Sequence, residues 1–69
     1  MNINQLRLHT PNYALRSEDN ILAQNGITIE PLHNGGFLVR APYLPGKVVM
    51  IPENNVQFAL GDDEPRAKK

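Results

Sequence analysis

The two histidines are the side chains of this sequence best suited to acid–base chemistry, because an imidazole changes charge near neutral pH. His9 and His33 lie far apart, and neither stands in a motif with a nucleophile or an orienting carboxylate. Neither has acidic or thiol neighbours at the spacing of a metal site, and the chain has no cysteine. We therefore predict an exposed strand end for His9 and a turn for His33, with no bound metal.

The other potentially reactive side chains also lack the context of an active site. Ser17 is not in a nucleophile elbow, and the adjacent carboxylates of Glu18 and Asp19 are typical of a solvated or capping loop. No helix or lysine follows the turn at residues 34–36 at the spacing of a phosphate-binding loop. The sequence therefore predicts a protein that is not an enzyme, with no catalytic residue and no cofactor.

Binding to another protein is the function that the sequence favours. Tyr43 and Leu44 lie between two prolines in an exposed loop, where an apolar side chain must pack back on the domain or contact a partner. Tyr13 and Pro52 are the other two predicted partner-binding residues. An edge strand could serve instead, and the first predicted strand near residues 6–8 is the candidate.

Nucleic-acid binding is the alternative, because three basic residues could share one face of antiparallel strands. These residues are Arg7, Arg40 and Lys47. Against this, the seven Lys and Arg residues are cancelled by seven Asp and Glu residues, and no aromatic residues are interleaved with the basic ones. Solvated side chains are therefore the preferred interpretation of this set.

Six prolines and five glycines divide the chain into short apolar segments of the length of β-strands. Strands are predicted at residues 3–9, 27–30, 37–41, 47–51 and 56–60. Residues 13–24 are predicted to form an irregular hairpin loop, with one capped helical turn as the open alternative. The polar segment 61–69 is predicted to be a disordered tail. Five short strands with little helix predict an all-β fold, a small barrel over residues 1–60.

Residues 36–59 resemble the second half of an SH3 domain. The strand Phe37-Leu38-Val39-Arg40-Ala41 is followed by a glycine-containing loop, a second strand and the turn Pro52-Glu53-Asn54-Asn55-Val56. The resemblance implies a five-stranded SH3-like barrel with a 3₁₀ turn at Pro52 and a core position for Val56. Gly36 and Asn55 stand where the family places two aromatic residues of its peptide groove. We therefore expect no binding of ordinary proline-rich peptides, and little contribution of Asn55 to stability.

Size and composition set the remaining expectations. A single domain of 69 residues buries only about 60% of its unfolded surface, so homo-oligomerisation is an open route to stability. The absence of cysteine, signal peptide and membrane span predicts a cytoplasmic protein, in the host cytoplasm if the gene is carried by a phage. We predict a non-catalytic interaction domain, such as a phage or mobile-element accessory protein that binds a host factor. A structural subunit of a larger assembly is the third possibility.

Overall fold

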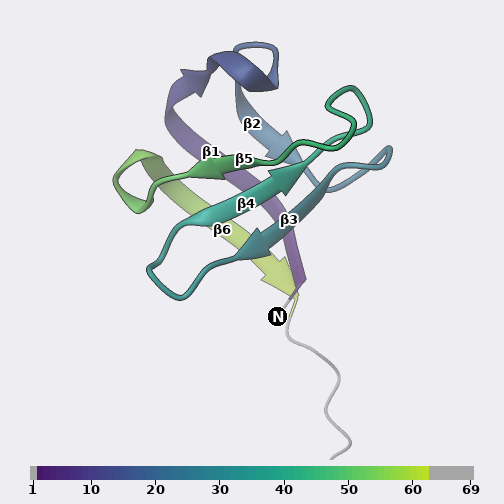
Figure 1. Cartoon of the computed structure of the whole chain (residues 1–69). Helices are drawn as coiled ribbons and strands as arrows, with labels where there is room; N and C mark the ends of the chain where they lie inside the picture. Colours follow the sequence, from purple (N-terminus) through teal and green to yellow (C-terminus); the bar gives the residue numbers. More distant parts are fainter. Residues whose placement is uncertain (1, 63–69) are drawn as a thin grey trace, which may run out of the picture.

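The computed structural model describes residues 2–62, which form six β-strands and two 3₁₀ turns. In chain order these are β1 (Asn2–Asn12), η1 (Tyr13–Leu15), β2 (Glu18–Leu22), β3 (Thr28–Pro31), β4 (Phe37–Arg40), β5 (Val49–Ile51), η2 (Glu53–Asn55) and β6 (Val56–Asp62). The predicted all-β class is confirmed. The prediction of five strands is wrong, because six strands form two antiparallel three-stranded sheets, ordered β2-β1-β6 and β3-β4-β5 (Figure 1).

The sixth strand is β2, which lies within the segment predicted to be an irregular loop. It pairs with β1 so that Ile21 lies opposite Leu6, and both side chains are buried. The chain reverses between β1 and β2 through η1 and two residues in the left-handed conformation, Arg16 and Ser17, each with φ of 57°. Glycine is the residue that usually marks this conformation in a sequence. Because Arg16 and Ser17 adopt it here, no glycine signals the turn.

β1 is the central strand of the first sheet, with β2 on one side and β6 on the other. The register places Leu6 between Ile21 and Ala59 on the inner face, and Arg7 between Asn20 and Phe58 on the outer face. The proposal that β1 offers an edge near residues 6–8 is therefore wrong. β1 is paired on both sides at Leu6 and Arg7 and with β6 at Leu8, and Leu6 and Leu8 are buried in the core.

The second sheet has one apolar inner face and a mixed outer face. Ile29, Val39 and Val49 lie side by side on the inner face. Glu30, Leu38 and Met50 lie side by side on the outer face. Neighbouring residues of a strand point to opposite faces, which explains this separation.

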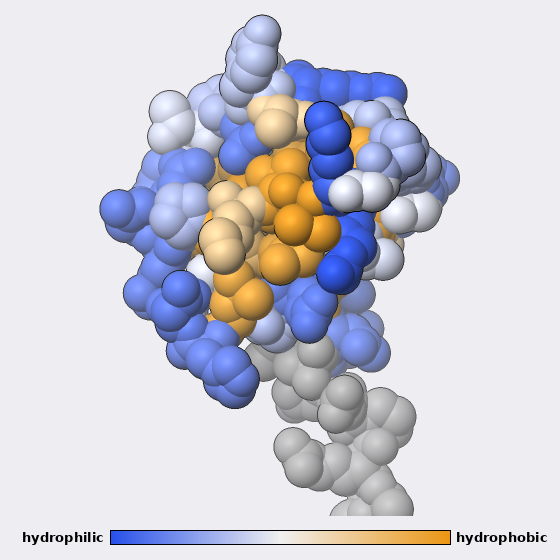
Figure 2. Space-filling model, in the orientation of Figure 1, coloured by the Kyte–Doolittle hydropathy of each residue, from blue (hydrophilic) through white to orange (hydrophobic). Residues whose placement is uncertain are grey.

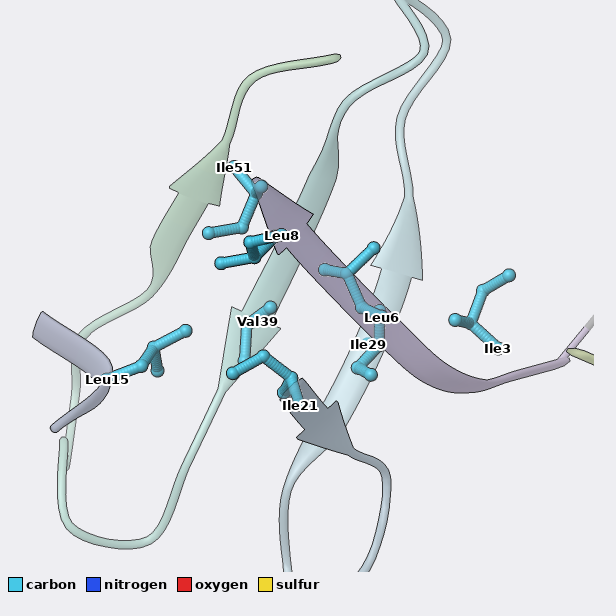
Figure 3. Close-up of a cluster of buried hydrophobic side chains, with 8 residues drawn as sticks. All are labelled: Ile3, Leu6, Leu8, Leu15, Ile21, Ile29, Val39 and Ile51. Atoms are coloured by element: carbon cyan, nitrogen blue, oxygen red, sulfur yellow. The ribbon is translucent and has the colours of Figure 1, made fainter. Parts of the chain in front are cut away.

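The core lies between the two sheets and takes side chains from five strands and from η1 (Figure 3). Its members are Ile3, Leu6, Leu8, Leu15, Ile21, Ile29, Val39 and Ile51. Phe37 and Val56 are half-buried and pack against this cluster, whereas Phe58 is 41% exposed. Phe58, an aromatic residue of the predicted last strand, is therefore not a core residue, because its pairing with Arg7 places it on the outer face.

The predicted 3₁₀ turn at Pro52 is present as η2, and Asn55 fastens it to the end of β1. The Asn55 Oδ1 accepts hydrogen bonds from the Thr10 amide at 2.9 Å and from the Thr10 hydroxyl at 2.8 Å. The Asn55 Nδ2 donates to the Thr10 carbonyl at 3.2 Å. β6 then continues to Asp62, two residues into the segment predicted to be a tail; the remainder of that segment lies outside the described residues.

We expect Asn55→Ala to lower the free energy of unfolding by about 1–2 kcal/mol, because it removes three hydrogen bonds at a partly solvated site. This differs from the expectation that Asn55 contributes little. Asn54→Ala is the matched control from the same turn, since its exposed side chain takes no part in these hydrogen bonds, so its loss should be smaller. Urea denaturation measures both, and a stability of Asn55→Ala equal to that of the wild type would contradict the role given to this clamp.

Candidate functional site

The described residues contain no group of three or more His, Cys, Asp or Glu side chains that could hold a metal ion. Both histidines are exposed. Every buried side chain of residues 2–62 is apolar, so no buried polar group is held in place for chemistry. The candidate site is therefore a surface.

Tyr43 and Leu44 are committed to contacts within the domain. Leu44 is half-buried and packs against the core, and its amide donates to the Ala41 carbonyl at 3.0 Å. The Arg16 guanidinium lies over the Tyr43 ring, 3.9 Å from its centroid. This cation–π contact joins the turn between β1 and β2 to the loop between β4 and β5. Both side chains support that loop, and neither stands free in solvent.

The predicted partner-binding residues are not gathered on one surface. Tyr13 lies in η1 and is 92% exposed. Tyr43 and Leu44 precede β5, whereas Pro52 follows it, so they lie at opposite ends of that strand (Figure 1). Of the four, only Pro52 borders an apolar hollow, whose other lining residues are Leu32, Asn34, Met50 and Ile51.

The basic residues of the alternative hypothesis are also separated. Arg7 is on the outer face of the first sheet, and Arg40 is on the outer face of the second, across the core. The Arg40 guanidinium forms an exposed ion pair with the Glu30 carboxylate at 3.3 Å. Lys47 lies nearer to Arg40, and both line a shallow depression beside the loop between β4 and β5. The three residues do not form a single basic face.

The outer face of the second sheet carries an apolar patch that the sequence analysis did not identify. Its members are Leu38 of β4, which is half-buried, Met50 of β5, which is 66% exposed, and Val48, which precedes β5 and is 49% exposed. Leu38 and Met50 lie directly opposite each other in the sheet. Met50 also lines the hollow beside Pro52, so patch and hollow form one continuous surface, which we call the β5 patch. Figure 2 shows apolar atoms gathered in the middle of this face, with hydrophilic residues around them.

A signal for the β5 patch was present in the sequence. Residues 48–51 are all apolar, whereas a strand with one solvated face alternates apolar and polar residues. Because the alternating side chains of Val49 and Ile51 point inward, that of Met50 points outward, and Val48, just before β5, is exposed as well. A continuous apolar run in a strand of so small a sheet therefore indicates that both faces of the strand are apolar.

Comparison with known proteins finds no matching family model, no matching curated protein and no matching solved structure. The resemblance of residues 36–59 to SH3 domains therefore stays a prediction. Within residues 2–62 no helix is long and apolar enough to cross a membrane.

Proposed function

We propose that this protein is a non-catalytic protein–protein interaction domain that binds its partner through the β5 patch. The observation that carries the proposal is the exposure of Met50 and Val48 beside an apolar hollow. Contiguous apolar surface on a small domain is a common mark of an interaction site. Methionine suits such a surface, because its unbranched thioether adapts to differently shaped partners.

The form of the patch indicates what the partner presents. The exposed Met50 side chain stands next to the hollow between Leu32 and Pro52, so a partner can cover the methionine and insert an apolar side chain beside it. The Arg40–Glu30 ion pair lies on the same face and offers both charges at the rim. An apolar centre with a polar rim is the usual arrangement of a protein interface.

We also propose that the two sheets belong to an SH3-like barrel. The all-β class, the antiparallel order β3-β4-β5 and the 3₁₀ turn before the last strand support this assignment. The mode of binding would differ from that of SH3 domains, which grip proline-rich peptides between aromatic side chains. Here Gly36 and Asn55 occupy the matching positions, and Asn55 is engaged with Thr10.

The nucleic-acid alternative has less support, because Arg7 is separated from Arg40 and Lys47 by the core. The two functions differ in their response to salt. Contacts with phosphates would make binding fall steeply with salt concentration, whereas an apolar protein interface would respond weakly.

The test uses peptides selected for binding to the full-length chain from a random display library and mapped by NMR titration. Chemical-shift changes are expected at Leu38, Val48 and Met50. We expect Met50→Lys to weaken binding by about tenfold or more, the loss typical of a central apolar contact residue. Leu60→Lys is the matched control on the other sheet and should bind like the wild type. Shifts centred on Tyr13 or Tyr43, or unchanged binding by Met50→Lys, would exclude the β5 patch.

A further inference from the structure

The two sheets expose four terminal strands within residues 2–62, and three of them have features that prevent pairing with another chain. β2 begins with Glu18 and Asp19, so two copies would bring like charges together. β3 contains Glu30 and ends at Pro31, which has no amide hydrogen to donate. β5 is three residues long and is followed by Pro52. Charges, prolines and short length are the usual means by which natural edge strands avoid association.

The fourth terminal strand, β6, has none of these features between Val56 and Gly61. It is seven residues long and carries no charged residue or proline before Asp62. The Asp62 carboxylate lies at its end and accepts a hydrogen bond from the Asn4 amide group at 3.0 Å. Two large apolar side chains on the strand, Phe58 and Leu60, are 41% and 54% exposed. The unpaired backbone N–H and C=O groups of such an edge can form hydrogen bonds with a strand of another chain.

The pairing of β6 with β1 shows which part of that edge is regular. The register is continuous from Phe58 to Leu60, and it shifts on either side of this stretch. The regular stretch is therefore centred on Ala59, with Phe58 and Leu60 on the outer face of the sheet. A further strand would pair best where the backbone is straight, because a bulge interrupts the ladder.

We propose that β6 pairs with β6 of a second copy of this chain, antiparallel and about a two-fold axis near Ala59. In that register each Phe58 lies opposite the Leu60 of the other copy, on the same face of the sheet. Aromatic and aliphatic side chains that face each other across antiparallel strands stabilise the pair. The two sheets β2-β1-β6 then join into one sheet of six strands, and the contact is closed by its own symmetry.

Two properties favour a second copy of this chain as the partner of the β6 edge, namely the lack of charge on the edge and the small size of the domain. The edge is uncharged from Val56 to Gly61 and the whole chain has a net charge of zero, so no electrostatic repulsion opposes self-association. The domain has no disulfide, and its small core leaves oligomerisation as a source of added stability. A strand pair buries less area than a standard interface, so we expect a dissociation constant of roughly micromolar or weaker.

The inference does not depend on the proposed function. The β5 patch lies on the outer face of the second sheet, whereas β6 is the edge of the first sheet. Met50→Lys and Leu60→Lys each replace an exposed apolar side chain with a lysine, one on each surface. They should therefore separate the two activities, since the first affects partner binding and the second affects self-association.

The experiment is sedimentation equilibrium of the full-length chain from about 5 µM to about 1 mM, the range that brackets a weak dimer. The mass should rise with concentration from the 7.7 kDa of one chain towards twice that value. Leu60→Lys should weaken the dimer by about tenfold or more, because the two-fold axis makes the change act twice and adds a positive charge at each site. Met50→Lys should leave the dimer unchanged.

Phe58→Lys is the second variant, used if Leu60→Lys fails to fold, and it should weaken the dimer in the same way. Thermal unfolding at low concentration checks that each variant is folded. A mass of one chain at every concentration would overturn the proposal. So would a dimer that persists in both β6 variants or dissociates in Met50→Lys, because self-association would then use another surface.

Discussion

Gly36→Ala should destabilise the domain by about 2–4 kcal/mol, the cost of overpacking together with a weakened strand pairing. Gly36 is buried immediately before β4, and a Cβ there would lie 2.6 Å from the Ile51 carbonyl oxygen. That oxygen belongs to the backbone of β5, where Ile51 pairs with Phe37. The contact can be relieved only by a shift of backbone, either in the segment that leads into β4 or in β5. Because domains have only about 0.05–0.15 kcal/mol of stability per residue, this loss is a large part of the total.

Gly46→Ala is the matched control, since it adds the same methyl group in a different environment. A Cβ at Gly46 would meet no atom within 4 Å, but φ is 73°, in the left-handed region. The expected cost is therefore backbone strain alone, about 1 kcal/mol. Urea denaturation of both variants gives the comparison. Gly46→Ala could instead lower the free energy of unfolding as much as Gly36→Ala does, or more. That result would mean that the turn at residues 32–36 shifts to make room for a side chain.

The same geometry bears on the peptide groove of SH3 domains. A tryptophan at position 36 would meet the obstruction that alanine meets, because the clash involves the first side-chain carbon. Under the proposed SH3-like assignment, position 36 therefore does not accept a groove aromatic unless the backbone beside Ile51 moves. This supports a binding surface elsewhere, and the β5 patch is the surface that the proposed function uses.

Much of the second half of the fold could be predicted from the sequence, because its signals are local. Asn34 and Gly35 mark a turn that the structure contains: the Asn34 side chain accepts from the Gly36 amide at 2.9 Å, and Gly35 has a φ of 91°. The strand predicted at 37–41 is present as β4, and the proline at 52 opens η2. In each case the residue that indicates the turn or strand in the sequence also forms that local structure.

The first half and the candidate site were predicted less well, because they depend on pairings between distant residues. β2 forms because Ile21 is buried beside Leu6, fifteen positions earlier in the chain. The exposure of Phe58 follows from its register with Arg7, and that of Met50 from its register with Leu38. A shift of one residue would exchange the buried and exposed faces of a strand. Register is decided by tertiary packing, so an apolar residue alone does not reveal its face.

Leu15 is the clearest case of a core residue hidden in a segment that was predicted to be irregular. It lies in η1, where the Asn12 side chain accepts a hydrogen bond from the Ala14 amide at 2.9 Å and begins the turn. Its side chain is fully buried and points into the cluster between the sheets (Figure 3). The turn η1 therefore contributes a side chain to the core as the strands do. Truncation of the Leu15 side chain should leave a cavity.

We expect Leu15→Ala to lower the free energy of unfolding by about 2–5 kcal/mol, the range for a buried leucine that leaves a partly unfilled cavity. Tyr13→Ala is the control from the same turn: its side chain is 92% exposed, so the change should stay within about 0.5 kcal/mol. Urea denaturation with a two-state fit measures both variants. A small effect of Leu15→Ala would mean that η1 is only loosely attached, and the Arg16–Tyr43 contact that follows it would then lose its support. A large effect of both variants would instead indicate that the exposed Tyr13 ring is covered in solution.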